Sequence, residues 1–203
     1  MIARLPDAYF DAMYATSDDP WQLSSQWYEE RKYAITLSML PRPRYRHAFE
    51  PGCSIGTLTE RLATRCDAIT ATDVAAAALD HADRRLRAAG RRDQVNLMRH
   101  SLDEPWPEGD FDLVVFSEVG YYLHAETLRS VLDREHSRLD GVTVVAAHWR
   151  HPVEDYPMGG DHTNQIIAAT PGLLRLASYR DPDVAIEIFA GPDRSASDDS
   201  AQP

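Results

Sequence analysis

Hydrophobic residues follow two different spacings along this chain, and each spacing predicts a type of element. Apolar residues recur at helical spacing over 25–40, and Pro41 ends that helix. Short apolar runs, one of them almost continuous, predict the strands of a buried sheet. The predicted strands cover 46–50, 68–72, 95–98, 111–116, 142–147, 173–180 and 183–190. Further helices are predicted over 56–66, over 125–139, in the alanine-rich segment that ends at Ala89, and after Asp161.

The order of these elements predicts the fold class. Strand and helix alternate through most of the chain, which favours an α/β protein with right-handed crossovers and an open, mostly parallel sheet. Only Asp181 and Pro182 separate the last two strands, so these should form an antiparallel hairpin at the sheet edge. We therefore predict a seven-stranded sheet with helices on both faces, in a single domain over 1–191. Residues 192–203 are polar and acidic, and we predict a disordered tail there.

Composition and charge narrow the functional classes. A chain of 203 residues is long enough for one domain with its own core, and its net charge of −11 argues against a surface that binds nucleic acid. Its two cysteines, Cys53 and Cys66, do not make a disulfide framework, so we expect a reducing compartment and a cytoplasmic protein. The sequence shows no signal-peptide pattern and no apolar run long enough to span a bilayer. We therefore expect neither nucleic acid nor membrane as a partner.

Candidate chemistry gathers where the first predicted strand ends. The segment Glu50-Pro51-Gly52-Cys53-Ser54-Ile55-Gly56 leads from that strand into a helix, and its two glycines let backbone approach a ligand closely. A carboxylate two residues before the first glycine is unsuited to phosphate and favours a positively charged ligand, such as a sulfonium or an ammonium. Asp73 ends the next strand, at a spacing close to the roughly 20 residues of dinucleotide-binding folds. A carboxylate there can accept hydrogen bonds from both hydroxyl groups of a ribose.

Two other ligand classes fail on spacing. A dinucleotide site built as G-x-G-x-x-G from Gly52 needs glycines where the chain has Ser54 and Thr57. A phosphate-binding loop needs a lysine after its last glycine, and none follows Gly56. Two more strand ends carry polar residues that complete the pattern, namely Ser101-Leu102-Asp103 and Ser117-Glu118-Val119.

Three stretches carry a resemblance to a known family: 19–21 (DPW), 27–33 (WYEERKY) and 49–56 (FEPGCSIG). The chain resembles the class I S-adenosylmethionine-dependent methyltransferases, and within them the nodulation protein S family, which N-methylates an amino sugar of a lipo-chitooligosaccharide. The resemblance covers nearly the whole chain. It implies a Rossmann-like sheet and S-adenosylmethionine as cofactor, with S-adenosylhomocysteine as product. It also implies a small-molecule acceptor, most plausibly the nitrogen of an amino sugar or glycan. Ser54 departs from the commonest form of the turn, which has glycine there.

The same resemblance implies which residues contact the cofactor. Glu50 would lie near the methionine ammonium, Asp73 would hold the ribose, and Ser101 with Leu102 would lie at the adenine. Residues 1–44 would form an N-terminal helical lid. The implied set comprises Trp21, Tyr28 and Lys32 from the lid, and Glu50, Gly52, Cys53, Gly56, Asp73, Val74, Ser101, Leu102 and Ser117 from the sheet edge.

Candidate catalytic residues follow the fourth and fifth strands. Methyl transfer depends mainly on orientation, and a base is needed only to remove a proton from the acceptor. Glu118 is one candidate base, and its alternative is a solvated loop carboxylate. His148 and His151 are two more, and their alternative is a structural bond to loop backbone. We expect Asp161 to cap the helix that follows it. No residue pattern predicts a metal site.

Three functions stay open from the sequence. One is N-methylation of an amino sugar, the second is O-methylation of a small natural product or sugar, and the third is cofactor binding without catalysis. Tyr121 and Tyr122 either line the acceptor pocket or pack in the core. The sequence does not predict the oligomeric state.

Overall fold

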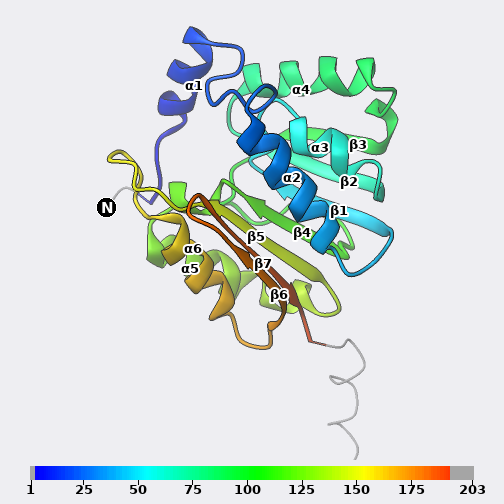
Figure 1. The fold of residues 1–203 in the computed structure, drawn as a ribbon, viewed down its shortest axis with the longest axis vertical. Helices are drawn as coiled ribbons and strands as arrows, with labels where there is room; N and C mark the ends of the chain where they lie inside the picture. Colours follow the sequence, from blue (N-terminus) through cyan, green and yellow to red (C-terminus); the bar gives the residue numbers. More distant parts are fainter. Residues whose placement is uncertain (1–2, 193–203) are drawn as a thin grey trace, which may run out of the picture.

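Figure 1 shows the computed structural model of the chain, which describes residues 3–192. The predicted disordered tail lies outside the described residues except for Pro192, so it stays a prediction. Within the described part of the chain, no helix is both long and apolar enough to cross a membrane. The single-domain boundary at 191 also stays a prediction.

One sheet contains all seven strands, and two of them form a C-terminal hairpin. The strands are β1 (Tyr45–Pro51), β2 (Cys66–Asp73), β3 (Val95–Arg99), β4 (Leu113–Ser117), β5 (Thr143–Trp149), β6 (Leu174–Arg180) and β7 (Val184–Ala190). Their order is β3-β2-β1-β4-β5-β7-β6. Strands β1 to β5 run parallel to one another, whereas β7 runs antiparallel to both β5 and β6. The predicted α/β class, the mostly parallel sheet and the terminal hairpin are confirmed.

Six helices and three short 3-10 turns lie within residues 3–192, and two of the helices precede the first strand. The helices are α1 (Asp7–Thr16), α2 (Trp27–Met39), α3 (Thr57–Leu62), α4 (Ala76–Ala88), α5 (Ala125–Arg134) and α6 (Gly160–Ala168). The 3-10 turns are η1 (Arg92–Gln94), η2 (Gly120–Tyr122) and η3 (His136–Leu139). Helix α2 stops where expected, because Leu40 before Pro41 is held in an extended conformation.

Three predicted helix features are corrected by the structure. The helix predicted over 56–66 ends at Leu62, because a turn follows it and Cys66 already pairs with β1. The helix predicted over 125–139 breaks after Arg134 and continues only as η3. Asp161 does not cap α6: the helix begins after Gly159, and the Asp161 carboxylate instead accepts hydrogen bonds from Arg150.

The sheet is covered on both faces, as a parallel sheet requires. Alternate residues of the central strands β4 and β5 enter two separate cores. One core includes side chains of α2, α3 and α4, such as Tyr33, Leu62 and Leu86. The other includes side chains of α5 and α6, such as Leu128 and Ile166. This two-sided packing leaves the carboxyl ends of the strands as the accessible edge (Figure 1).

A segment at the N-terminus reaches across this edge. Arg4 forms an isolated antiparallel bridge with Leu123, and the Leu5 N–H donates to the Tyr122 carbonyl over 2.9 Å. Helix α1 follows and packs its buried Phe10 in a small core beside the glycine turn. The N-terminal strap (residues 3–5) and α1 therefore lie across the carboxyl ends of the strands.

Candidate active site

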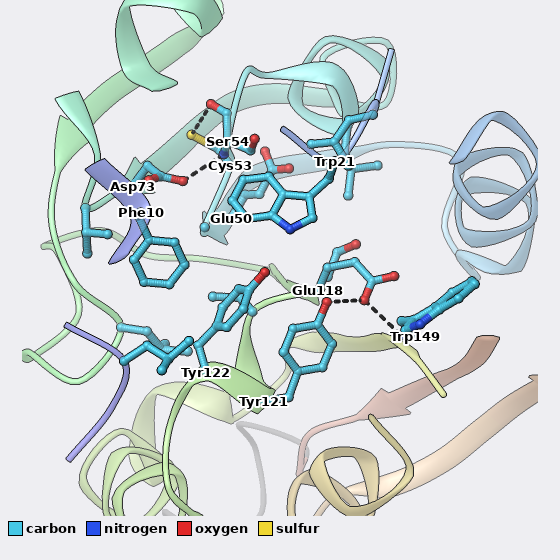
Figure 2. A pocket seen from close by; sticks show the side chains of 18 of the residues that line it. Phe10, Trp21, Glu50, Cys53, Ser54, Asp73, Glu118, Tyr121, Tyr122 and Trp149 are labelled. Carbon is cyan, nitrogen blue, oxygen red and sulfur yellow. Dashed lines mark hydrogen bonds between the residues drawn. The ribbon is translucent and has the colours of Figure 1, made fainter. Parts of the chain in front are cut away.

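A cavity of about 440 Å³ lies at the carboxyl ends of the strands, inside the roughly 300–1,000 Å³ range of small-molecule pockets. One wall, here called the glycine-turn side, consists of Glu50, Gly52, Cys53, Ser54 and Asp73. The opposite wall is here called the tyrosine side. It consists of Tyr28, Tyr121, Tyr122, Trp149 and Tyr156, and Glu118 also lines the cavity there. Figure 2 shows both walls, with Trp21 between them.

Positive backbone angles shape the glycine turn. Gly52 has φ 71°, Ser54 has φ 51° and Gly56 has φ 76°. A Cβ atom on Gly52 would lie 2.7 Å from Cγ2 of Val119, and one on Gly56 would lie 3.0 Å from Cβ of Ala82. The two glycines therefore let the turn lie against the loop after β4 and against α4, because a side chain at either position would push these segments apart.

The carboxylate of Glu50 is buried at the end of β1 with an unsatisfied atom. Its side chain lines the cavity and is 2% exposed, and its Oε2 has no hydrogen-bond partner. Burial raises the pKa of Glu50 to about 8. The Thr59 hydroxyl opposes this rise, and the charge of the Asp73 carboxylate adds to it. A cationic group entering the cavity here would supply the missing partner.

Asp73, at the end of β2, fixes the shape of the turn. Its Oδ2 accepts the Ser54 N–H and its Oδ1 accepts the Ala75 N–H, each over 2.9 Å. Burial raises the pKa of Asp73, although the hydrogen bonds from Ala75 and Ser54 oppose that rise. Each oxygen keeps a second lone pair for a ligand hydroxyl. The turn also binds α1, since the Tyr14 hydroxyl lies 2.5 Å from Oγ of Ser54.

Val74, Ser101, Leu102 and Ser117 all line the cavity, as the resemblance implies. The Ser101 hydroxyl already donates to the carboxylate of Asp103. These four residues come from the ends of three strands and the loops that follow them. The implied cofactor contacts are thus brought together, apart from Lys32 and Gly56, which do not line the cavity.

Glu118 occupies a left-handed backbone conformation with φ 54° directly after β4. Its Oε1 accepts hydrogen bonds from Nζ of Lys32 over 2.7 Å and from the Tyr28 hydroxyl over 3.3 Å. Its Oε2 accepts from the Tyr121 hydroxyl over 2.6 Å and from the Trp149 N–H over 2.8 Å. This carboxylate is therefore not a solvated loop group, because four donors from three other elements hold it.

These donors set the charge of Glu118. Burial alone would raise its pKa, but the Lys32 ammonium, with further help from the Tyr121 hydroxyl, holds the pKa of Glu118 below its ordinary value. A carboxylate that is ionised and fully hydrogen-bonded is a poor acceptor for a further proton.

Lys32 is buried beneath the tyrosine side. Its side chain is 1% exposed, and Nζ lies 2.7 Å from a carboxylate oxygen of Glu29 and 2.7 Å from one of Glu118. The ammonium also lies 5.1 Å from the ring centre of Tyr28. Lys32 thus joins α2 to the end of β4 and does not face the cavity, whereas Trp21 and Tyr28 do.

The structure places neither candidate histidine in the cavity. His148 is fully buried: its Nδ1 lies 2.7 Å from Oδ1 of Asn164, and its Nε2 accepts the Gly120 N–H over 3.2 Å. Burial lowers the pKa of His148, so the ring stays neutral with both nitrogens engaged. His151 is exposed and pairs with Asp183 over 2.7 Å. His148 thus bonds to backbone at one nitrogen, which is the expected structural alternative, whereas His151 pairs with a side chain instead of loop backbone, and a catalytic role for either stays a prediction.

Several cavity residues were not predicted from the sequence. Phe10 and Tyr14 come from α1, four residues apart on one helical face, and that spacing was the available signal. Tyr156 comes from the loop between β5 and α6, and its ring stacks on Tyr121 with centres 5.0 Å apart. Its hydroxyl lies 3.3 Å from that of Tyr122. No sequence signal placed this loop over the cavity. Among residues 3–192, no group of three or more His, Cys, Asp or Glu could hold a metal ion.

The strand order, the terminal hairpin and the cavity at the strand ends define the Rossmann-like fold of class I methyltransferases. A crystal structure of the N-methyltransferase NodS from Bradyrhizobium japonicum, in complex with S-adenosylhomocysteine, has the same fold. It is 23% identical, with a TM-score of 0.80 over 92% of this chain and 99% of that one. A crystal structure from Pseudomonas syringae is 36% identical, with a TM-score of 0.69 over 81% of this chain and 99% of that one.

The family model described as Nodulation protein S (NodS) matches residues 13–140, and the chain belongs to this family. The predicted family is thereby confirmed. The Nodulation protein S of Bradyrhizobium diazoefficiens is 36% identical over 107 residues, which are 52% of this chain and 50% of that protein. The chain spans about half the length of the curated relatives it matches.

Proposed function

We propose that this protein transfers a methyl group from S-adenosylmethionine to a small-molecule acceptor, namely the nitrogen of an amino sugar or glycan. The observation that supports S-adenosylmethionine as the methyl donor is the buried Glu50. Its oxygen without a partner lies in a residue that lines the cavity beside the glycine turn of a NodS-family protein. An apolar cavity with a carboxylate that lacks a cation suits a ligand with an ammonium group.

The residues of the glycine-turn side fit this cofactor. Glu50 would bind its ammonium, Asp73 would accept its ribose hydroxyls, and Leu102 would contact its adenine. S-adenosylmethionine, when bound, supplies a methyl group on a positively charged sulfur. The protein orients the acceptor toward that methyl and excludes water, which can contribute roughly 7–11 kcal/mol.

The tyrosine side fits an amine or amino sugar as acceptor. Tyr28, Tyr121 and Trp149 offer ring faces and edges around Glu118, and Tyr28 and Trp149 lie edge to face with centres 4.6 Å apart. Aromatic faces can stack on a sugar and stabilise a methylated ammonium product by roughly 0.5–2 kcal/mol. The related Bradyrhizobium japonicum protein is an N-methyltransferase, which supports nitrogen as the accepting atom.

We propose no side chain as the base that removes the proton of the acceptor. Glu118 was the first candidate, but its four hydrogen bonds support a positioning role that fixes the hydroxyl groups of Tyr28 and Tyr121. The amine would then have to reach the cavity neutral. Cys53 and Cys66 are free, which supports a reducing compartment and the proposed cytoplasmic location.

Calorimetric titration with S-adenosylhomocysteine tests cofactor binding. Asp73→Ala should weaken binding by about 10-fold to 100-fold, because two backbone anchors of the turn and two ribose hydrogen bonds are lost. Asp67→Ala is the matched control on the same strand, since its side chain is 56% exposed, and it should bind normally. No heat and no thermal shift at millimolar ligand would rule out the proposed cofactor.

A panel of amines and hydroxyl compounds tests the acceptor. Methylation of amino sugars supports the proposal, and methylation only of hydroxyl compounds would replace it with O-methylation. Cofactor binding with no transfer to any member would favour a binding protein without catalysis.

A further inference from the structure

We propose that Glu50 is protonated in the free protein and releases its proton to solvent when the cofactor's ammonium group binds. This inference rests on the proposed function and concerns the chemistry of the same cavity. Capture of the cofactor would then be coupled to the loss of one proton, so the pH of the solution would set the affinity.

The first observation is the isolation of the carboxyl group. Its side chain is 2% exposed and its Oε2 has no hydrogen-bond partner. An ionised carboxylate in such a place loses its hydration with only the Thr59 hydroxyl to compensate, so the neutral acid is favoured. Burial accordingly raises the pKa of Glu50 to about 8.

The second observation is the charge of the groups around Glu50. Asp73 at the end of β2 is the charged group whose electrostatic effect raises the pKa of Glu50, and that effect is the effect of a negative charge. Tyr33 of α2, Cys53 of the turn and Cys66 of β2 also interact with it electrostatically, and all three have a raised pKa and stay neutral. Thr59 of α3 contributes only a hydroxyl. None of these neighbours supplies a cation.

The third observation is that the basic groups lining the described cavity are engaged elsewhere. Arg4 pairs with Asp7 over 2.7 Å and with Asp103 over 2.9 Å. His100 directs Nε2 to the Pro105 carbonyl over 3.0 Å. Both belong to the Ser101 end of the cavity. A cation that comes to Glu50 therefore has to arrive with the ligand, and the ammonium of the cofactor is that cation.

The proton balance is simple. Before binding, Glu50 holds one proton and the ligand carries an ammonium. After binding, the carboxylate and the ammonium form an ion pair, and the proton of Glu50 has passed to the buffer. No other bond forms or breaks.

Titration calorimetry with S-adenosylhomocysteine in two buffers of the same pH but different ionisation enthalpy measures this proton directly. At about pH 7 we expect the release of roughly one proton per ligand, falling as the pH is raised past about 8. Below about pH 7 the apparent Kd should rise roughly tenfold per pH unit. Binding whose enthalpy does not depend on the buffer would overturn the inference.

Variants and a second ligand make the assignment specific. Glu50→Gln should bind S-adenosylhomocysteine with no proton release, and Glu60→Gln, which changes a partly exposed glutamate on α3 paired with Arg85, should behave as wild type. 5′-Methylthioadenosine lacks the ammonium group and should bind without releasing a proton. If Glu50→Gln still releases one proton, the inference fails. If S-adenosylhomocysteine gives no heat in either buffer, the proposed function itself fails.

Discussion

Two glutamates end neighbouring strands, and their surroundings are opposite. Glu50 at the end of β1 has an oxygen without any donor, and burial raises its pKa to about 8. Glu118 after β4 accepts four hydrogen bonds, and its pKa lies below its ordinary value. Glu50 is 2% exposed and the Glu118 side chain is 18% exposed, so both are largely withdrawn from solvent and their hydrogen-bond partners decide their charge. The protein itself supplies the hydrogen-bond donors and the cation for Glu118. For Glu50, a ligand would have to supply them.

The largest effect should come from removing the cation that serves Glu118. Lys32→Met leaves the Glu29 and Glu118 carboxylates buried without a counter-ion, at a cost of about 3–5 kcal/mol. At roughly 2–4 °C per kcal/mol, the melting temperature should fall by about 6–20 °C. Arg61→Met of α3 is the control, because it breaks a partly exposed pair with Glu30, which lies on α2 like Lys32, and should shift the melting temperature little. Equal shifts in the two variants would contradict the contrast.

A smaller loss is expected from Glu118→Gln. The amide keeps the shape but loses the charge and turns an N–H group toward donors, at a cost of about 1.5–3 kcal/mol, or roughly 3–12 °C. Because the folded pKa of Glu118 is depressed, its contribution to stability is present above the ordinary value and is lost as the pH falls through the folded value. The difference in melting temperature between wild type and variant should therefore shrink in acid. A constant difference down to about pH 3 would argue against an ionised Glu118.

Gly52 lies between the two strand ends, and its replacement tests their contact. Gly52→Ala puts a Cβ 2.7 Å from Val119, whereas Gly90→Ala has the same kind of backbone angle with nothing within 4 Å. Both variants carry the left-handed penalty of about 1–2 kcal/mol. Overpacking should cost Gly52→Ala a further 1–3 kcal/mol, or roughly 2–12 °C in a thermal melt. Identical melting temperatures for the two alanine variants would show that Val119 moves aside freely.

Near pH 5 the smallest effect on stability is expected for Glu50→Gln, and at higher pH its sign is opposite to that of the other variants. The folded pKa of Glu50 is raised, so its protonated form stabilises the fold at low pH, and this stability is lost as the pH rises from about 4.5 through about 8. Glutamine resembles the neutral acid, so the variant should nearly match wild type near pH 5 and melt roughly 10–20 °C higher near pH 9. A lower melting temperature at both pH values would mean that Glu50 is ionised and paired.

The sequence was sufficient for the fold and for the glycine-turn side, because their signals are local. The turn Glu50–Gly56 and Asp73 lie at adjacent strand ends, and their order along the chain fixes their proximity. The environment of Glu118 depends on Lys32, 86 residues earlier, and on a backbone N–H 31 residues later, and no local pattern encodes such contacts. The burial of His148 was not predicted for the same reason. Its partner Asn164 lies on α6, and no pattern near His148 indicates that contact.

The antiparallel hairpin has a consequence for how the chain is made. Strand β7 lies between β5 and β6 in the sheet, yet it is synthesised after both. While the ribosome is still adding Val184–Ala190, β5 is an unpaired edge and β6 has no neighbour to join. Nascent or truncated chains that stop before β7 would therefore expose a β5 edge that favours aggregation, and completion of the last strand closes the sheet.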